Sequence, residues 1–442
     1  MNGGWGDRRH TVAAVCAAIA VVSAALFPVT TPAQARQSAA ANSARLESVQ
    51  VSGSSRFSSA QIVAATSLHV GSDVTREDLQ KAADTLAQLG AFASVNYRFG
   101  STDTGVRAEY QVTDAPAVPV WFDNFPWFTD DEILTALKST VPLFDGKSPE
   151  HGTLLDALAD AIENLLVRRG APAQVSHELM AAPLGNERIQ VFRAEIPGLN
   201  VASVEFSDPL AQNDRVVQQL LPDLVGKPYS RIAVEVFEFE HVQPTYLARA
   251  FLRVRFGSPT AKLADGAGNT RVNVSAPIDP GPTFAFNGVT WNGNKAITTG
   301  ELLVLLPLRP GDPADGMKME AGWHAIRDAY AHRGFLDAEL TATPQFDDDA
   351  KRVTYVVAIT EGPQYRMGKL VLTGLSTEGE RRIRGAWKLA PGAVFDSSAF
   401  DDFLDTGIRQ AFMGLPFHYE KIGRFLQKDP QAGSVDVLLD FQ

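Results

Sequence analysis

The chain has 442 residues, more than one hydrophobic core supports, and its formal net charge of −11 argues against a dedicated nucleic-acid-binding protein. Hydrophobic residues make up 45 % of the sequence and charged residues 21 %, which excludes a largely disordered chain. The single cysteine excludes an internal disulfide framework and a Cys-rich metal site. Composition thus predicts several globular domains without cysteine chemistry.

The first segment, residues 1–35, is predicted to be a secretory signal peptide. The basic pair Arg8-Arg9 precedes an uncharged run rich in Ala and Val at 11–27, and Ala-Gln-Ala at 33–35 supplies a small-x-small cleavage pattern. The alternative is an uncleaved inner-membrane anchor, because the apolar run is at the short limit of a membrane span. Cys16 lies in this run, so cleavage would leave a mature protein without cysteine. We therefore expect export to the periplasm.

A repeat of about 80 residues follows. Its clearest mark is a small residue that ends a helical pattern just before a strand pattern, at positions separated by 80, 80, 84 and 80 residues. These residues are Gly90, Gly170, Ala250, Gly334 and Gly414. Glycine suits such a position because it adopts the left-handed conformation that ends a helix. Ala250 departs from this rule, so we expect that helix to end differently.

Other glycines recur within the repeat. They occupy the turn between two helical patterns at Gly71, Gly146, Gly226, Gly311 and Gly392, and the end of the opening strand at Gly53, Gly293 and Gly374. Helix N-cap candidates after the turn are Thr75 with Asp78, Ser230 and Asp396. Residues 234–239 alternate Val or Phe with Glu, as a strand would, but their position after Ser230 favours a helix.

Each repeat therefore opens with a strand, passes through two helices and closes with a β-hairpin. In the first repeat, alternation at 46–51 predicts the strand and the pair 94–99 and 106–112 predicts the hairpin. We expect an α+β protein of five tandem β-α-α-β-β domains, each a three-stranded sheet covered by two helices. The expected domains are residues 44–114, 117–197, 199–279, 282–361 and 364–441.

This pattern resembles the POTRA (polypeptide-transport-associated) family. In the first repeat it is carried by Val-Gln-Val-Ser-Gly at 49–53, by Gly71, and by Leu-Gly-Ala-Phe at 89–92. The resemblance implies the periplasmic arm of BamA-type outer-membrane assembly and secretion factors. In that family tandem POTRA domains precede a β-barrel, recruit lipoproteins and bind client strands by β-augmentation. The fifth repeat ends near Gln442, so we expect a stand-alone arm, or one whose barrel is encoded elsewhere, without insertase activity.

We find no sequence signature of catalysis. The motifs G-x-S-x-G, Walker A and H-E-x-x-H do not occur, and the histidines are scattered. Asp347-Asp348-Asp349 lacks the alternating spacing of a calcium loop and is typical of a hairpin turn. We expect no catalytic, cofactor-binding or metal-binding residues, and hence a protein that is not an enzyme.

The segment 121–128, Trp-Phe-Asp-Asn-Phe-Pro-Trp-Phe, is the most unusual stretch. Filling the small core of the second domain is the favoured interpretation. The alternative is a partner-binding patch made by Trp121, Phe122, Phe125 and Trp127. Expected partners are extended or unfolded β-rich client polypeptides, with an outer-membrane barrel or accessory lipoproteins as further candidates, and no nucleic acid. The leading function is a periplasmic polypeptide-binding scaffold in outer-membrane protein assembly or translocation. The alternative is an inner-membrane-anchored scaffold of a periplasmic complex, such as a division complex.

Overall fold

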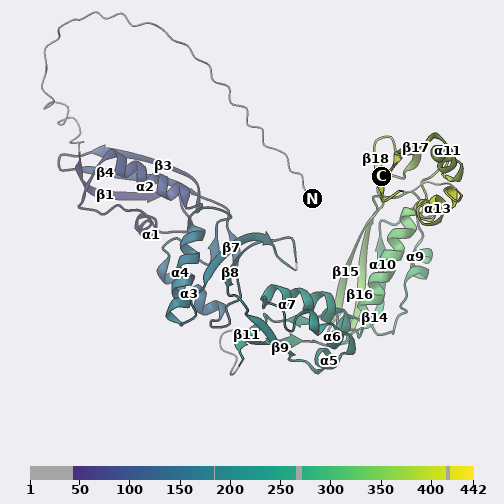
Figure 1. Ribbon diagram of the computed structural model, residues 1–442, viewed down its shortest axis with the longest axis horizontal. Helices are drawn as coiled ribbons and strands as arrows, with labels where there is room; N and C mark the ends of the chain where they lie inside the picture. The colour runs from purple at the N-terminus through teal and green to yellow at the C-terminus, as the bar shows by residue number, and fades with distance from the viewer. Residues whose placement is uncertain (1–42, 184, 265–270, 415–418) are drawn as a thin grey trace, which may run out of the picture.

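The structure is a computed structural model that describes residues 43–183, 185–264, 271–414 and 419–442. The predicted signal peptide lies outside the described residues. The described elements form successive modules, each with its own β-sheet, along a curved chain (Figure 1). Within these ranges no helix combines the length and apolar character needed to cross a membrane.

Modules 1 and 2 have the same order of elements. Module 1 consists of β1 (Ala44–Ser52), α1 (Ser59–Ala64), β2 (Asp73–Val74), α2 (Arg76–Gln88), β3 (Phe92–Ser101) and β4 (Val106–Asp114). Module 2 consists of β5 (Val118–Asp123), α3 (Asp130–Thr140), β6 (Lys147–Ser148), α4 (Leu154–Arg168), β7 (Gln174–Ala181) and β8 (Arg188–Glu195). The short strands β2 and β6 lengthen their sheets by one antiparallel pairing to β1 and β5.

Module 3 has a more broken helical layer. Its elements are β9 (Asn200–Phe206), α5 (Pro209–Asn213), α6 (Arg215–Leu220), a 3-10 turn η1 (Leu221–Asp223), α7 (Arg231–Phe237), a π-helical turn η2 (Glu238–Val242) and α8 (Gln243–Leu247). The strands β10 (Arg255–Phe256), β11 (Thr260–Leu263), β12 (Arg271–Ala276) and β13 (Ile278–Asp279) follow. The helix expected over residues 234–239 is confirmed, since α7 continues directly into η2.

Module 4 has a simpler helical layer, whereas module 5 again contains a π-helical turn. Module 4 consists of β14 (Ala285–Asn292), α9 (Thr299–Leu305), α10 (Gly316–Ala331), β15 (Glu339–Asp347) and β16 (Arg352–Thr360). Module 5 consists of β17 (Arg366–Thr373), α11 (Thr377–Ala386), α12 (Ser397–Asp402), a π-helical turn η3 (Phe403–Gly407), α13 (Ile408–Ala411), β18 (Ile422–Asp429) and β19 (Ser434–Phe441).

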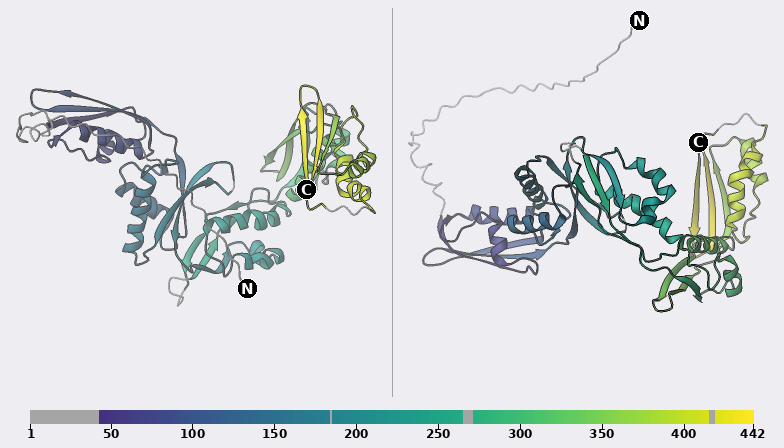
Figure 2. Two further views of the ribbon diagram at one scale, coloured as in Figure 1. Left: turned by 45° about the horizontal axis from the view of Figure 1, so that its top comes forward. Right: turned by 90° about the horizontal axis from the view of Figure 1, so that it is seen from below.

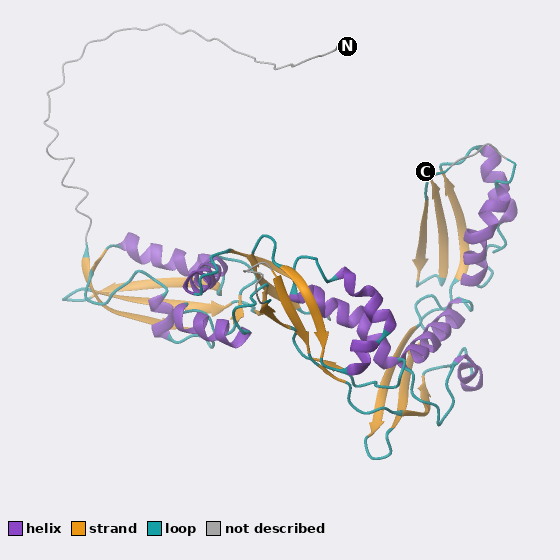
Figure 3. Ribbon diagram, turned by 60° about the horizontal axis from the view of Figure 1, so that its bottom comes forward, coloured by secondary structure: helices purple, strands orange, loops and turns teal. Residues whose placement is uncertain are grey.

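All five modules share one sheet topology. The opening strand runs parallel to the closing strand, which pairs antiparallel with its own hairpin partner, as in the orders β14-β16-β15 and β17-β19-β18. Helices cover one face of each sheet, which is clearest for the C-terminal module in Figure 3. The predicted α+β fold of tandem β-α-α-β-β units is confirmed. Figure 2 shows from two further sides how the modules follow one another.

Side-chain caps define where the helices begin. The Thr75 hydroxyl accepts from the Asp78 N–H while the Asp78 carboxylate accepts from the Thr75 N–H at 2.8 Å, a reciprocal capping box. Ser230 and Asp396 likewise cap α7 and α12. These three predicted N-caps are confirmed.

Ala250 corrects an expectation about helix endings. It adopts a φ of +68°, the left-handed conformation that glycine takes at Gly90, Gly170, Gly334 and Gly414. The helix therefore ends in the same way, and the expected different ending is wrong. The strain of alanine in this conformation is about 1 kcal/mol. The Ala250 side chain is buried in the core of module 4, and its carbonyl accepts from the Phe284 N–H at 3.1 Å. Packing between modules 3 and 4 thus offsets the strain.

Candidate functional site

Among the described residues, the main sheet of each module ends in an open edge. The hairpin strands β3, β7, β11, β15 and β18 each pair on one side only within their sheets. An edge strand leaves alternate N–H and C=O groups unpaired, and an extended peptide can satisfy them. An open edge alone does not select a partner, so the side chains beside it decide which edge forms a site.

The strand-end glycines lie where each opening strand meets the closing strand. Gly53, Gly293 and Gly374 have φ values of +99°, +88° and +76°. A Cβ atom on them would lie 2.1, 2.1 and 1.8 Å from the carbonyl oxygens of Val112, Ile359 and Phe441. Gly71, Gly311 and Gly392 also have positive φ, in the turns between helices. All of these glycines have a structural role in the sheets and turns. None of them lines the grooves described below, although Gly392 directly follows the groove-lining Pro391.

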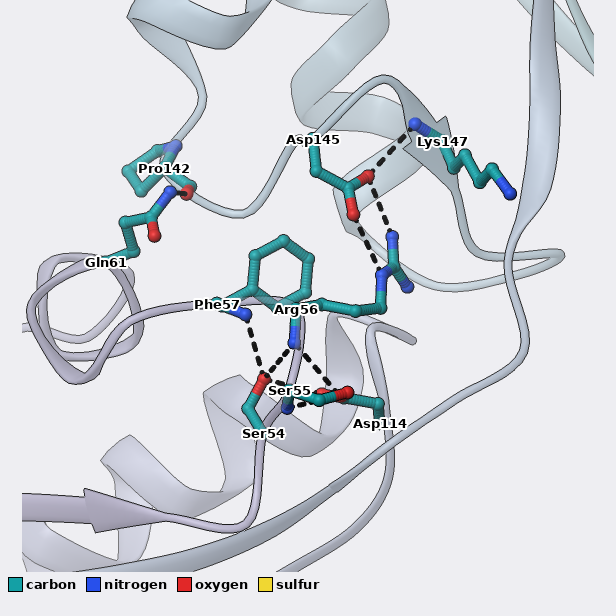
Figure 4. Close-up of polar contacts among 9 residues, drawn as sticks. All are labelled: Ser54, Ser55, Arg56, Phe57, Gln61, Asp114, Pro142, Asp145 and Lys147. Carbon is teal, nitrogen blue, oxygen red and sulfur yellow. Dashed lines mark hydrogen bonds and ion pairs between the residues drawn. The ribbon is translucent and has the colours of Figure 1, made fainter.

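Polar contacts tie modules 1 and 2 together. The Arg56 guanidinium donates through Nε and Nη2 to the Asp145 carboxylate, both at 2.9 Å, and Gln61 donates to the Pro142 carbonyl at 3.2 Å (Figure 4). Burial alone would raise the pKa of Asp145, but hydrogen bonds from Arg56 and from the Lys147 N–H outweigh it and lower the pKa. The carboxylate therefore stays ionised and the ion pair stays formed at neutral pH.

Two helices also meet end to end at this joint. The N–H of Thr153 donates to the Gln88 carbonyl at 2.9 Å, so the start of α4 bonds to the end of α2. The two helix ends carry opposite partial charges, which favours this contact. The backbones approach closely, since a Cβ atom on Gly90 would lie 1.8 Å from the His151 carbonyl oxygen. One buried cluster of apolar side chains runs through both modules. Modules 1 and 2 therefore form one packed unit.

A buried carboxylate joins modules 2 and 3. Asp123, at the end of β5, is fully buried and accepts from the Arg231 N–H at 2.6 Å, from Ser230 Oγ at 2.9 Å and from Arg193 Nε at 3.1 Å. The Arg231 guanidinium in turn donates to both Asp130 oxygens at 2.8 Å. Asp123 thus satisfies donors at the start of α7 from the neighbouring module. This pairing could not be predicted from the sequence, because Asp123 and Arg231 are 108 residues apart.

Some side chains of the aromatic segment 121–128 lie in the shared core of modules 1 and 2, and others lie at the joint with module 3. Phe122 and Phe125 are buried in the shared core of modules 1 and 2. Trp127 packs against that core and also against the core of module 3. Trp121 packs with Ile189, Val191 and Ile232, and the Arg231 guanidinium lies 6.0 Å from its ring centroid. Three of the four residues of the predicted patch, Phe122, Phe125 and Trp127, also line one groove, whereas Trp121 is not in its lining.

An open groove of about 460 Å³ lies between this segment and the edge strand β11. Residues 124–132 of module 2 and residues 258–262 of module 3 line it, together with Phe122, Tyr229 and Arg231. The Asn124 Oδ1 atom in this lining is buried and has no hydrogen-bond partner among the described residues. The groove thus combines aromatic side chains, a polar acceptor and a strand edge.

The register of β11 shows which of its backbone groups face the open edge. The Ala264 N–H donates to the Arg271 carbonyl at 2.9 Å, and Lys262 is opposite Asn273 in the antiparallel ladder. Because N–H groups alternate in direction along a strand, those of Ala261 and Leu263 point away from β12. An extended peptide beside β11 can therefore bond to them.

A second unusual carboxyl lies in the helical layer of module 3. Glu238 is 1 % exposed, and its Oε1 atom has no partner among the described residues. Burial and the neighbouring Glu235 raise the pKa of Glu238 to about 8. No group of three His, Cys, Asp or Glu side chains in the described part of the chain could hold a metal ion. Asp347 to Asp349 lie at the β15–β16 turn, where Asp347 accepts from the Ala350 N–H at 2.8 Å.

Part of the chain matches the model of a known protein family. Residues 284–362, which contain module 4, match the family model for POTRA, described as a surface antigen variable number repeat. With the repeated sheet topology, this makes the chain similar to tandem POTRA-domain proteins.

Particular relatives share part of their length with this chain. A putative outer membrane protein assembly factor of Treponema pallidum is 25 % identical over 211 residues, covering 46 % of this chain and 25 % of that protein. The outer membrane protein assembly factor BamA of Neisseria meningitidis is 22 % identical over 197 residues, covering 42 % of this chain and 24 % of that protein. The chain therefore spans about a quarter of the length of these relatives. Among solved structures, POTRA domains 3 to 5 of Haemophilus influenzae BamA superpose with a TM-score of 0.42 at 19 % identity, covering 56 % of this chain and 100 % of that chain.

Proposed function

We propose that this chain is a non-enzymatic periplasmic scaffold that binds extended polypeptide segments in outer-membrane protein assembly. The names of the curated relatives support the setting, since both are assembly factors. The five domains expected from the sequence would be its structural units, and outer-membrane clients or accessory proteins its partners. Export through residues 1–35 and association with the outer membrane belong to the same proposal.

The observation that carries the proposal is the groove beside β11. Main-chain pairing to an edge strand accepts any extended sequence, whereas side-chain pockets beside the edge determine which peptide sequences bind most tightly. Here the N–H groups of Ala261 and Leu263, which point away from β12, lie on the edge that the groove flanks. Trp127 and Phe128 provide apolar and aromatic contact area in the same groove. A client segment with alternating apolar side chains is the occupant that fits.

The test uses one position with two substitutions. Proline at Ala261 removes the edge-facing N–H without removing a bond to β12, whereas valine at the same position keeps it. We expect A261P to weaken binding of a fluorescent peptide from a transmembrane β-strand by about tenfold, measured by anisotropy on the whole exported chain. A261V should bind as the unmodified chain does. Equal binding by all three proteins would contradict pairing at β11.

A further inference from the structure

Module 5 carries a second groove. It lies beside an edge formed by an opening strand, whereas the β11 edge is formed by a hairpin strand. This second groove has a volume of about 540 Å³ and is lined by residues 367–372 of β17, by Arg384 and Trp387, and by Leu389 and Pro391. β17 is the opening strand of its module, and it forms the edge of the order β17-β19-β18. This site is therefore separate from the hairpin edges to which the proposed function refers.

On the side facing away from β19, the backbone of β17 has partners at Met367 and at the Leu370 carbonyl. The Met367 N–H donates to the Ala393 carbonyl at 2.8 Å, and the Gly392 N–H donates to the Met367 carbonyl at 2.6 Å. Further along, the Leu370 carbonyl accepts from Arg384 Nη1 at 3.0 Å. Leu372 lies two residues beyond, so its N–H and C=O face the same open side as those of Leu370.

Equivalent positions in two other modules are capped by side chains. In module 1 the Ser59 hydroxyl donates to the Val51 carbonyl at 2.9 Å, and in module 3 the Phe206 N–H donates to Gln212 Oε1 at 2.9 Å. Among the residues that the structure describes, no side chain caps Leu372 in this way. Within the described part of the chain, the β17 edge is thus left uncapped at Leu372, which lines the groove.

The charged side chains that line the groove are of one sign, although Arg384 forms an ion pair with Glu380 beside it. Lys369 and Arg384 are the charged side chains in its lining, and both are basic. Arg384 is held in place by Glu380, which accepts from Arg384 Nε at 2.9 Å. The guanidinium has five N–H donors, so it still has donors for an incoming carboxylate. Trp387, Leu389 and Pro391 supply the apolar wall.

We propose that this groove binds an extended acidic polypeptide segment, which pairs with the second half of β17 and places carboxylates on Lys369 and Arg384. Alternate apolar side chains of the segment would lie against Trp387 and Leu389. The inference rests on the proposed polypeptide-binding function and adds to it a second site with a charge preference. The paired edge is short, so the charges contribute most of the selectivity, and binding should weaken as salt is added.

The probes are two short labelled peptides, one of alternating Val and Glu and one of alternating Val and Lys, titrated by anisotropy into the whole exported chain. We expect the Val-Glu peptide to bind at least about tenfold more tightly than the Val-Lys peptide. K369E, which changes an exposed side chain, should remove most of this difference, and R384Q should reduce it. K295E, at an exposed lysine of module 4 that lines neither groove, is the matched control and should leave the difference unchanged.

The outcomes separate this inference from the proposed function. Equal binding of both peptides, or no effect of K369E on the Val-Glu peptide, would overturn the acidic site in module 5. If A261P still weakens binding of the client peptide in that case, the proposed function stands without the second site. If neither peptide nor the client peptide binds the chain, both proposals are wrong.

Discussion

At the residue scale, the side chain of Asp123 is central to the joint between modules 2 and 3. It is a fully buried carboxylate whose partners come from two modules. Removing one member of such a cluster leaves the others desolvated and unpaired, which costs more than the pair contributes in net stability. The joint between modules 2 and 3 should therefore depend on this one side chain.

We predict that Asp123→Ala lowers the free energy of unfolding of modules 2 and 3 by about 3 kcal/mol. Urea denaturation followed by tryptophan fluorescence would measure it, because Trp121 and Trp127 lie at this joint. Asp131→Ala, at an exposed carboxylate nearby, is the control and should change stability by less than about 0.5 kcal/mol. Equal effects of the two substitutions would contradict the assigned role of Asp123.

Gly90 and Gly170 form a matched pair with nearly the same backbone conformation. Their φ values are +78° and +77°, but a Cβ on Gly170 meets no atom within 4 Å whereas one on Gly90 would collide with His151. We predict a loss of about 1 kcal/mol for Gly170→Ala, from backbone strain alone, and of about 3 kcal/mol for Gly90→Ala. Thermal unfolding compares the two. Similar losses would mean that modules 1 and 2 do not touch at this point.

At the element scale, α7 and the π-helical turn η2 place two carboxyl groups in the interior of module 3. Glu238 begins η2 and lies one turn after Glu235, whose pKa is also raised by burial. A carboxyl whose folded pKa is raised binds its proton more tightly in the folded state than in the unfolded state. Its contribution is therefore fully present below the ordinary pKa of 4.5 and is lost as pH rises toward 8.

We predict that the free energy of unfolding of module 3 falls by a few kcal/mol between about pH 5 and pH 8, because unfolding releases the Glu238 proton. Glu238→Gln keeps the shape of the side chain without its ionisation. Its stability should change less over the same range, as measured by denaturation at a series of pH values. Parallel pH profiles for the two proteins would rule out a protonated Glu238 in the folded chain.

The elements were largely predictable from the sequence, whereas the site was not. Short-range signals such as the Thr75–Asp78 cap, the spaced glycines and the alternating strands act within a few residues, and repetition made each one stronger. The groove beside β11 depends on how module 2 meets module 3, through contacts such as Asp123 with Arg231 that are far apart in sequence. The aromatic segment was noticed, but its division between two cores follows from that joint. Ala250 was misjudged because packing from module 4 offsets its strain.

At the scale of the whole molecule, the joints decide how the sheet edges are presented. Modules 1 and 2 share a buried cluster, aligned helix ends and the Arg56–Asp145 ion pair. The Asp123 cluster then joins module 2 to module 3. The edge of β11 is thus held at a fixed position beside residues of the preceding module.

We predict that Arg56→Ala broadens the distance distribution between spin labels placed on modules 1 and 2, because it removes an interaction of about 1 kcal/mol from the joint. The pair Arg98–Glu109 lies within module 1 and its arginine is 84 % exposed, so Arg98→Ala is the control. Pulsed electron paramagnetic resonance should show no broadening for the control. The same width for Arg56→Ala and the unmodified chain would mean that the ion pair does not restrain the joint.

Under the proposed function, the β11 edge receives client polypeptides in the cell. Photo-cross-linking from Lys262, with Val216 on the exposed face of α6 in the same module as the control position, tests it most directly. We expect outer-membrane or secreted β-rich polypeptides to be captured from Lys262 and not from Val216. Capture of no such polypeptide, or equal capture from both positions, would contradict it.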